Sequence, residues 1–475
     1  MPDWRRLLRE PARPDAIRSR PNAHWYAVAT VCIGAFMGQL DASIVTLAFP
    51  ALEDEFGAGI GAVTWVGLTY LLVLVGLVAP VGRLADMAGR KLLYTYGFAV
   101  FILGSALCGF APNLLTLNLF RAAQAVGAAM LQANSVAIIY AAMPRDKLGR
   151  GIGIQGAAQA LGLALGPTVG GLLVQAGGWR WIFWVNVPMG IAGVVLGWLF
   201  IPRSRNLVSR SPFDFTGLAL FFPGVAALLA AISLGNDAGW TSPWILVLFA
   251  VAVAALAAFL LRERVTASPM LPLALFRRLP FTAGIGSGLL SYLVMFGTLF
   301  VVPFYLQRAL GLGPSRSGLI LTVMPVVLGV IAPLAGRWAD RVGPRPLTVS
   351  GMVVCAVALA GLALLESDMT LLVAGLVLLG IGMGLFTPPN NAAIMAAAPG
   401  DQSGVAAGVL NMTRGIGTAL GLAATGLVFA AVAGENASAA DLVTRGFSAA
   451  AWFLAAVAAV AAVLSALRGR ARLDP

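Results

Sequence analysis

The feature that most limits what this chain can fold into is a series of about fourteen apolar runs, each long enough to cross a membrane as a helix. Only 11% of the residues are charged, whereas a soluble protein carries about 25%. The sequence therefore predicts an all-α polytopic membrane protein. The expected spans are 25–50, 61–82, 92–111, 114–142, 151–176, 180–201, 214–235, 241–261, 281–307, 316–336, 346–365, 370–396, 404–432 and 446–467.

Arginine and lysine are unevenly distributed between the loops that join these runs. If the N-terminus lies in the cytoplasm, 25 of the 31 Arg and Lys residues fall in cytoplasmic segments, and only Arg121 and Arg414 fall within spans. Cytoplasmic loops of membrane proteins collect Arg and Lys. The asymmetry predicts that both termini are cytoplasmic, and it explains the net charge of +12 without a nucleic-acid partner.

Two stretches of sequence recur at a nearly constant distance. "GRLADMAGRK" from Gly82 returns as "GRWADRVGPR" from Gly336, and five glycines between 149 and 171 return 255 residues later. Two parallel six-helix halves that enclose a central site are typical of secondary transporters. The predicted parts are an N-terminal tail at 1–24, an N-terminal half at 25–202, a two-helix insert with linkers at 203–278, a C-terminal half at 279–467 and a tail at 468–475.

Several motifs carry a resemblance to a known family. "GRLADMAGRK" resembles the signature loop of the major facilitator superfamily, and "LGPTVGG" resembles the antiporter motif of that superfamily. "WRWIFWVNVPMG", "PFDFTGLAL" and "PMLPLALFRR" resemble its fourteen-helix drug:proton antiporter branch. The resemblance implies the major facilitator fold, with helices arranged 6 + 2 + 6. It also implies a proton-coupled multidrug exporter that works by alternating access in a bacterial cytoplasmic membrane.

Asp41 stands apart from the other 18 acidic residues because it is the one clearly within the apolar part of a span. An intramembrane carboxylate is costly and indicates a functional site. "LDASIV" and "RAAQAVGAA" resemble the family's motifs on the first and fourth helices, which implies proton coupling for Asp41 and Arg121. Ala125 stands where the second motif usually has glycine. The alternatives are a structural Asp41, and an Arg121 that binds substrate or helix carbonyls.

The loop motif predicts a contact between the halves at the cytoplasmic face. A carboxylate there can meet a helix N-terminus or an arginine and so favour one conformation. The resemblance implies a latch that holds the outward-open state, made by Gly82, Asp86, Gly89, Arg90 and, in the second copy, Asp340. Prolines follow Asp340, so the second latch is expected to be weaker or purely structural. The alternative for Arg90 is an orienting charge alone.

The fifth run carries a stripe of small residues. Small residues let helices approach closely in lipid, and a proline can bend a helix. We expect this face to seal a gate against proton leak; plain helix packing is the alternative. The residues concerned are Gly162, Gly166, Pro167, Gly170 and Gly171.

Polar and aromatic side chains within the spans are candidates for a substrate cavity. They are Gln39, Gln132, Asn134, Gln159, Tyr305, Asn390, Asn411 and Arg414. Because two intramembrane bases accompany one acid, the cavity is not expected to be acidic. A dicationic substrate would prefer a second carboxylate, so neutral, zwitterionic, monocationic or weakly anionic amphipathic substrates are favoured.

Other classes of function lack the residues that they need. The chain has one histidine, His24, and three cysteines within apolar runs, so neither a metal site nor a catalytic triad is expected. No phosphate-binding P-loop is present, so ATP is not expected to be the energy source. The resemblance implies a proton gradient as the energy source, and no cofactor is expected. The expected partners are a small amphipathic substrate, protons and the lipid bilayer, with the chain as a monomer. The alternative is an exporter or flippase-like carrier of an endogenous lipid-like molecule or natural product.

Overall fold

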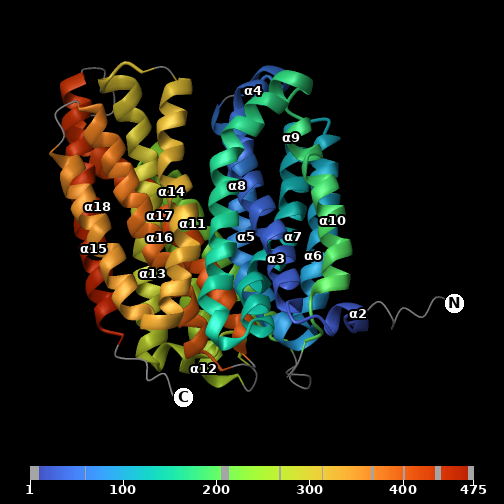
Figure 1. Ribbon diagram of the computed structural model, residues 1–475. Helices are drawn as coiled ribbons and strands as arrows, with labels where there is room; N and C mark the ends of the chain where they lie inside the picture. Colours follow the sequence, from blue (N-terminus) through green and yellow to red (C-terminus); the bar gives the residue numbers. More distant parts are fainter. Residues whose placement is uncertain are drawn as a thin grey trace.

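The computed structural model describes residues 10–58, 60–204, 213–266, 269–312, 314–364, 368–399, 402–433 and 440–468. Within these ranges the chain forms helices and no strands, and the long helices stand side by side (Figure 1). Their apolar segments are buried against one another or exposed on the outer surface of the bundle, as expected where lipid is the solvent.

The helices fall into two groups with a pair between them. The first group and the segments before it are α2 (Asp15–Arg18), α3 (Ala23–Ile44), η1 (Val45–Ala48), α4 (Phe49–Phe56), α5 (Ile60–Ala88), α6 (Arg90–Gly109), α7 (Leu114–Ala142), η2 (Arg145–Lys147), α8 (Leu148–Gly177), α9 (Trp181–Trp184) and α10 (Asn186–Phe200). The pair is α11 (Phe215–Ala238) and α12 (Pro243–Val265). The second group is η3 (Leu273–Arg277), α13 (Leu279–Phe304), η4 (Tyr305–Ala309), α14 (Pro314–Val342), α15 (Pro344–Ala363), α16 (Met369–Ala397), α17 (Ser403–Ala433) and α18 (Ala440–Ala466).

The expected all-helical membrane architecture is confirmed. In the described part of the chain, 13 helical segments are long and apolar enough to cross a membrane, and α9 with α10 forms one of them. The bent helix α8 would be the fourteenth: its axis turns by 44° between Gly166 and Thr168, at Pro167. A proline within a helix removes one backbone hydrogen bond, which accounts for a bend at this point.

Glycine contacts show that the two groups pack in the same way. Gly162 on α8 packs against the carbonyl of Phe36 on α3, and Gly417 on α17 packs in the same manner against the carbonyl of Leu289 on α13. These contacts relate α8 to α17 at the predicted offset of 255 residues, and α3 to α13 at 253.

A second set of contacts extends the same symmetry to four further helices. Gly97 on α6 packs against Gly127 on α7, as Gly351 on α15 packs against Gly382 on α16. The offset is 254 residues between α6 and α15 and 255 between α7 and α16. The repeat seen in the sequence is therefore a repeat of helix packing, with a pseudo-twofold relation between the halves.

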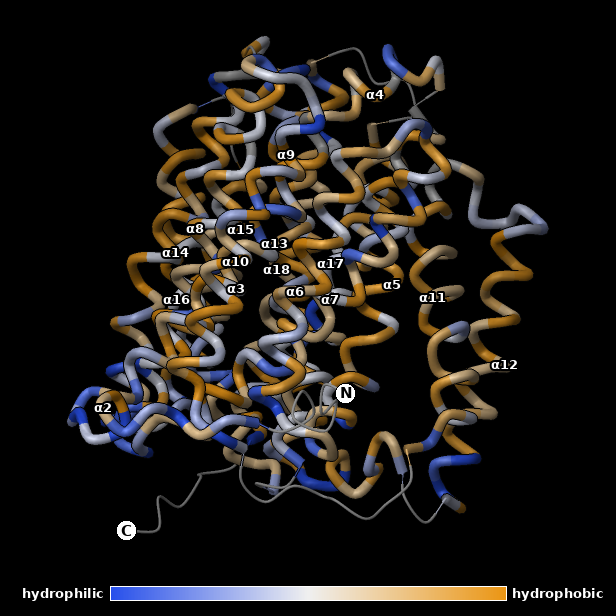
Figure 2. The backbone as a smooth tube through the Cα atoms, turned by 90° about the vertical axis from the view of Figure 1, so that its right-hand side faces the viewer, coloured by the Kyte–Doolittle hydropathy of each residue, from blue (hydrophilic) through white to orange (hydrophobic). Residues whose placement is uncertain are grey.

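The inserted pair lies at the edge of the bundle. α11 contacts α5 of the first half and α17 of the second, with Gly76 of α5 against the ring of Phe222, and α12 packs on α11 (Figure 2). α12 exposes large apolar side chains such as Trp244 and Val253. A helix that is apolar on its exposed side is suited to contact with lipid.

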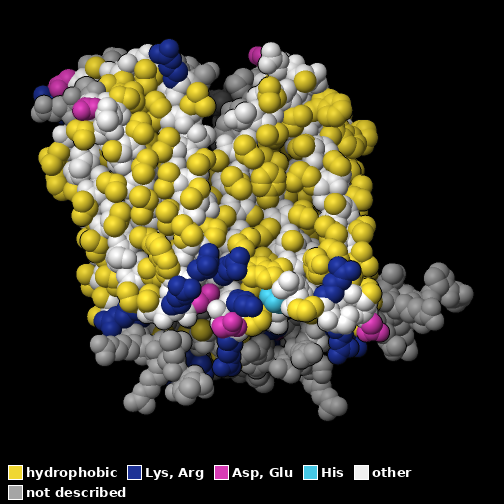
Figure 3. Space-filling view, viewed as in Figure 1, with side chains coloured by type: hydrophobic (Ala, Val, Ile, Leu, Met, Phe, Trp, Pro, Cys, Tyr) yellow, Lys and Arg dark blue, Asp and Glu magenta, His cyan; other side chains and the backbone are white. Residues whose placement is uncertain are grey.

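Charged side chains mark one end of the molecule. Figure 3 shows Lys and Arg side chains gathered at the end that carries the α5–α6 turn, beside a broad apolar belt. We call this end the basic face. At the opposite end a groove separates the two halves in the same view.

Candidate functional site

The carboxylate of Asp41 lies at the centre of a buried polar cluster, and its own hydrogen bonds join three helices of the N-terminal half. Asp41 on α3 is fully buried, and its Oδ2 accepts a hydrogen bond from Arg121 Nη1 on α7 at 2.8 Å. Its Oδ1 accepts from Gln124 Nε2 on α7 and from Asn186 Nδ2 on α10, both at 2.9 Å. Both carboxylate oxygens therefore have partners, as a charge buried in a membrane requires.

Arg121 has further partners besides its ion pair. Its Nε donates to the carbonyl of Val66 on α5 at 3.2 Å, and its Nη1 also donates to Gln124 Oε1 at 2.7 Å. The guanidinium lies over the ring of Tyr70, 4.2 Å from the ring centroid. This is cation–π geometry in a site shielded from water. The structure thus brings together the two residues that the sequence assigned to proton coupling.

Three members of the cluster were not singled out from the sequence. They are Gln124, Asn186 and Ser105, whose Oγ accepts from Asn186 at 3.1 Å and donates to a backbone carbonyl at 2.8 Å. Gln124 stands three residues after Arg121, so the two share a helix face, and that spacing could have found it. For Asn186 the available signal was only an amide within an apolar run, which does not tell which helix it faces.

In the described part of the C-terminal half, the equivalent helices carry no counterpart of this cluster. At the offsets given by the glycine contacts, Asp41 corresponds to Val294 on α13 and Arg121 corresponds to Leu376 on α16. Both of these residues are fully buried. The ionisable pair therefore belongs to one half only, although the two halves share a helix arrangement.

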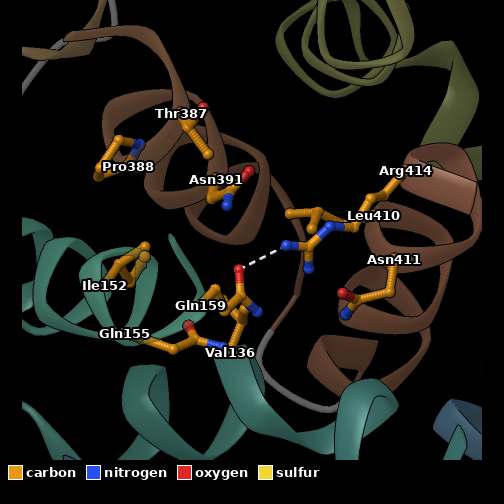
Figure 4. A pocket seen from close by; sticks show the side chains of 11 residues that line it. Val136, Ile152, Gln155, Gln159, Thr387, Pro388, Asn391, Leu410, Asn411 and Arg414 are labelled. Carbon is orange, nitrogen blue, oxygen red and sulfur yellow. Dashed lines mark hydrogen bonds between the residues drawn. The ribbon is translucent and has the colours of Figure 1, made fainter. Parts of the chain in front are cut away.

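A cavity lies between the halves, beside a hydrogen bond that joins them. Arg414 Nη2 on α17 donates to Gln159 Oε1 on α8 at 2.6 Å (Figure 4). The guanidinium also lies 5.2 Å from the ring centroid of Tyr292 on α13. The cavity has two adjoining parts with free space of about 10 and 40 Å³, which share Gly156, Gln159, Thr387, Pro388 and Arg414. Because both halves line it, relative movement of the halves would change its shape and access.

The structure places four of the predicted cavity residues in this lining: Gln39, Gln159, Asn411 and Arg414. Thr387 and Tyr292 also line it, and sequence reasoning did not place them there. A hydroxyl or an aromatic ring occurs on many helix faces in lipid, so neither residue type distinguishes a cavity from the helix packing around it.

The other four predicted cavity residues are not in this lining. Gln132 lies nearby and its backbone carbonyl accepts from Asn411, whereas the side-chain amide of Asn134 donates within its own helix. Asn390 is buried towards the end of the bundle, where its amide donates to the carbonyl of Gly284. Tyr305 is fully buried and stacks on an aromatic ring of α18. Helix rotation, which polarity alone does not reveal, decides these positions.

The predicted latch residues make contacts between the halves at the basic face. Asp86 at the end of α5 accepts from the backbone N–H groups of Gly404 and Val405 at 2.9 and 3.0 Å, in the first turn of α17. Arg90 pairs with the same carboxylate at 2.7 Å. Gly82 packs against the carbonyl of Gly404, where a Cβ would overlap it. A carboxylate at a helix N-terminus is stabilised by the unpaired N–H groups and the helix dipole.

The second copy makes the same contact with exchanged halves. Asp340 at the end of α14 accepts from the N–H groups of Gly149 and Arg150 at 2.8 and 3.2 Å, in the first turn of α8. Gly336 packs against the carbonyl of Gly149 as Gly82 does against Gly404. Where the first copy has Arg90, the second has Pro344. Asp340 therefore lacks that arginine, but it has the same two kinds of backbone partner.

The turns that carry these aspartates both need glycine. Gly89 and Gly343 have φ values of 115° and 82°, which side chains rarely adopt. Gly89 has a further constraint, because a Cβ there would collide with the carboxylate of Glu10. Glu10 accepts from the N–H of Ser204 at 2.6 Å and the N–H of Leu92 at 3.1 Å, so it ties the N-terminal segment to this turn. No pattern in the sequence predicts this contact.

The glycine stripe on α8 packs against α3, the helix that carries Asp41. Gly162, Gly166 and Gly170 face the backbone or side chains of Phe36, Ser43 and Ile44 so closely that a Cβ would displace them. Gly171, which was expected on the same stripe, is exposed. It follows Gly170 by one residue, which turns it by about 100° away from a stripe repeating every four residues. Close packing of α8 on α3 therefore accounts for three of these glycines.

Sequence comparison relates this chain to transport proteins. The profile of the Major Facilitator Superfamily matches residues 31–262 and 284–474. The riboflavin transporter RibZ of Clostridioides difficile is 35% identical over 404 residues, which cover 84% of this chain and 87% of that protein. The multidrug resistance protein Stp of Mycobacterium tuberculosis is 36% identical, covering 84% and 74%. The tetracenomycin C resistance and export protein of Streptomyces glaucescens is 33% identical, covering 88% and 78%.

Solved structures share the fold at low sequence identity. The human organic anion transporter MFSD10 aligns with a TM-score of 0.68 at 15% identity, over 94% of this chain and all of that one. The proton:xylose symporter XylE aligns with a TM-score of 0.64 at 14% identity, over 93% and 95%. At these identities the likeness concerns the arrangement of helices and not the substrate.

Proposed function

The chain belongs to the major facilitator superfamily, and on that premise we propose that it is a proton-coupled exporter of small amphipathic compounds such as drugs or antibiotics. It is a multi-pass membrane transporter and not an enzyme. The observation that carries the proposal is the buried Asp41–Arg121 pair, in which a carboxylate that can take up a proton is held by a permanent cation in one half of the molecule. Relatives named for multidrug resistance and antibiotic export support the substrate class and the direction.

In the proposed mechanism, protonation of Asp41 changes how α3 is held. The ionised carboxylate attracts Arg121 and accepts hydrogen bonds from the side-chain amides of Gln124 and Asn186. Once protonated, it no longer attracts the guanidinium, which keeps the Val66 carbonyl as a partner. This loosens α3 against α7 and α10. One such carboxylate suits one proton per transport cycle, driven by the proton gradient without a cofactor.

The contact between α3 and α8 provides the route from proton to substrate. α8 packs on α3 through the glycine stripe, carries Gln159 in the cavity, and meets Asp340 through its first turn. A displacement of α3 would therefore be transmitted to both the cavity and the basic face. We propose that this face, with both termini, is cytoplasmic, because cytoplasmic loops collect Arg and Lys. The membrane is then the bacterial cytoplasmic membrane, in which the chain works as a monomer.

The test is transport in proteoliposomes with an imposed pH gradient, using riboflavin, norfloxacin and rhodamine 123 as probes. Asp41→Asn keeps the shape and most hydrogen bonds but cannot exchange a proton. We expect this variant to lose gradient-driven accumulation while still exchanging substrate across the membrane without a gradient. Asp54→Asn, at an exposed carboxylate outside the spans, is the matched control and should behave like the unmodified protein. Gradient-driven export by Asp41→Asn at the unmodified rate would refute the proposal.

A further inference from the structure

The two arginines that the sequence analysis placed within spans, the buried Arg121 and the partly buried Arg414, have opposite electrostatic surroundings. Arg121 is neutralised by Asp41 at 2.8 Å, outside the lining of the central cavity. Arg414 lies in that lining, and its polar partner is the neutral amide of Gln159. Among the described residues, no ion pair includes Arg414 and no carboxylate lines either part of the cavity. The cavity therefore carries one uncompensated positive charge.

The position of this charge follows from the symmetry of the fold. Gln159 and Arg414 are 255 residues apart, the offset that relates α8 to α17, so they occupy equivalent places on equivalent helices. Their side chains meet between the halves (Figure 4). An amide on one side and a guanidinium on the other form an asymmetric pair at the centre of the cavity. The guanidinium has more donors than the single Gln159 oxygen can occupy.

We propose that Arg414 is the substrate anchor, and that it binds an anionic or acceptor-rich group, such as a carboxylate, of an aromatic amphiphile. This proposal rests on the proposed function and names its substrate class. The Gln159 oxygen holds the guanidinium when the cavity has no substrate, and the substrate oxygen takes its place. A carboxylate is the better acceptor because its bond to arginine is charge-assisted and can be bidentate.

The rest of the lining suits the apolar part of such a molecule. Tyr292 presents its ring beside the guanidinium, and Met295, Met324 and Leu328 line the larger part of the cavity. Flexible methionines and an aromatic ring adapt to planar ligands of differing shape. The free space of about 10 and 40 Å³ is smaller than a small-molecule site, so the halves must move apart to admit such a molecule.

Binding of substrate at Arg414 would also affect movement of the two halves relative to each other. The Arg414–Gln159 bond joins α17 of one half to α8 of the other. A substrate that takes over the guanidinium removes this direct bond between the halves. An anionic substrate is thereby coupled to rearrangement of the halves, whereas a lipophilic cation is repelled by Arg414 and leaves the bond in place.

The experiment compares two xanthene dyes of similar shape and opposite charge, fluorescein and rhodamine 123, in proteoliposomes and in binding to the purified protein by fluorescence anisotropy. We expect fluorescein to have the lower KM. Arg414→Gln should raise the KM and Kd for fluorescein at least tenfold, with kcat within twofold. The KM for rhodamine 123 should be unchanged or lower. Arg414→Lys should recover part of the loss, because lysine restores the positive charge but not the planar pair of N–H donors of a guanidinium.

A purely structural role for the Arg414–Gln159 bond predicts a different pattern. In that case Gln159→Ala would impair transport as much as Arg414→Gln, and transport of both dyes would fall equally. We expect instead that Gln159→Ala lowers the Kd for fluorescein, because it removes the oxygen that competes for the Arg414 guanidinium. Equal loss of binding for both dyes, or failure of fluorescein to bind, would overturn the inference.

Asp41→Asn separates this inference from the proposed function. If rhodamine 123 is exported in an Asp41-dependent manner and fluorescein is not, proton-coupled export stands and the anionic substrate class is wrong. If fluorescein binds in an Arg414-dependent manner but neither dye is moved in an Asp41-dependent manner, the anchor stands and proton coupling is wrong.

Discussion

Removing the aspartates at the basic face should shift the balance between the closed and open forms of that face. Asp86→Ala removes the carboxylate that accepts hydrogen bonds from two backbone N–H groups of α17. Asp86 is 1% exposed. A hydrogen bond to a charged group contributes about 1.5–3 kcal/mol, so two at the lower end give about 3 kcal/mol. The ratio of closed to open molecules should therefore fall roughly 100-fold, since every 1.4 kcal/mol is about tenfold.

Asp340→Ala should have a smaller effect in the same direction. Asp340 has the same two kinds of partner, but one bond is longer, at 3.2 Å, and the carboxylate is partly exposed. We expect about 2 kcal/mol, or roughly a 30-fold change in the ratio. Because the two contacts lie at different helix pairs, their effects on the one transition should add.

The assay is the distance between spin labels on the two halves, measured by double electron–electron resonance. Labels at Arg145 and Val342, both exposed, would report separation of the basic face. Asp368→Ala is the matched control, because it removes a similar cap from the first turn of α16 within one half. An unchanged distance distribution in the Asp86→Ala, Asp340→Ala double variant would refute the assignment of these contacts as a latch, as would an equal change in Asp368→Ala.

Three further predictions follow from particular contacts. Gly336→Ala puts a methyl group onto the carbonyl of Gly149, so transport should fall at least tenfold with normal membrane insertion, whereas Gly361→Ala, which meets open space, should transport normally. Arg121→Gln leaves Asp41 buried without its cation and should lower unfolding stability in detergent by about 3–5 kcal/mol; adding Asp41→Asn should restore most of it, and equal stability of the single and double variants would contradict the ion-pair argument. Glu10→Gln weakens the tie to Ser204, so limited trypsin digestion at Arg13 and Arg18 should become several-fold faster; an unchanged rate would mean that this contact does not hold the segment.

The sequence alone was sufficient for the membrane architecture, the repeat and the buried acid. Apolar runs of spanning length leave few structures besides helices, because backbone groups in lipid must be paired within the segment. The offset of 254–255 residues predicted the two similar halves, and the glycine contacts show the reason: the recurring glycines lie where helices touch. Asp41 was identifiable because a carboxylate in an apolar run is rare.

Only the tertiary structure decided which partners these residues have. Asp41 is bound by Arg121, Gln124 and Asn186 from two other helices, and the sequence holds no record of how those helices are rotated or how deep they lie. The same rotations neutralise Arg121 and leave Arg414 in the cavity with only an amide, although in sequence both are single arginines in apolar runs. Pairing across helices depends on the rotation and depth of each helix, which the packing of the whole bundle sets. The sequence therefore indicated that the cavity is not acidic, but it did not show which arginine supplies its positive charge.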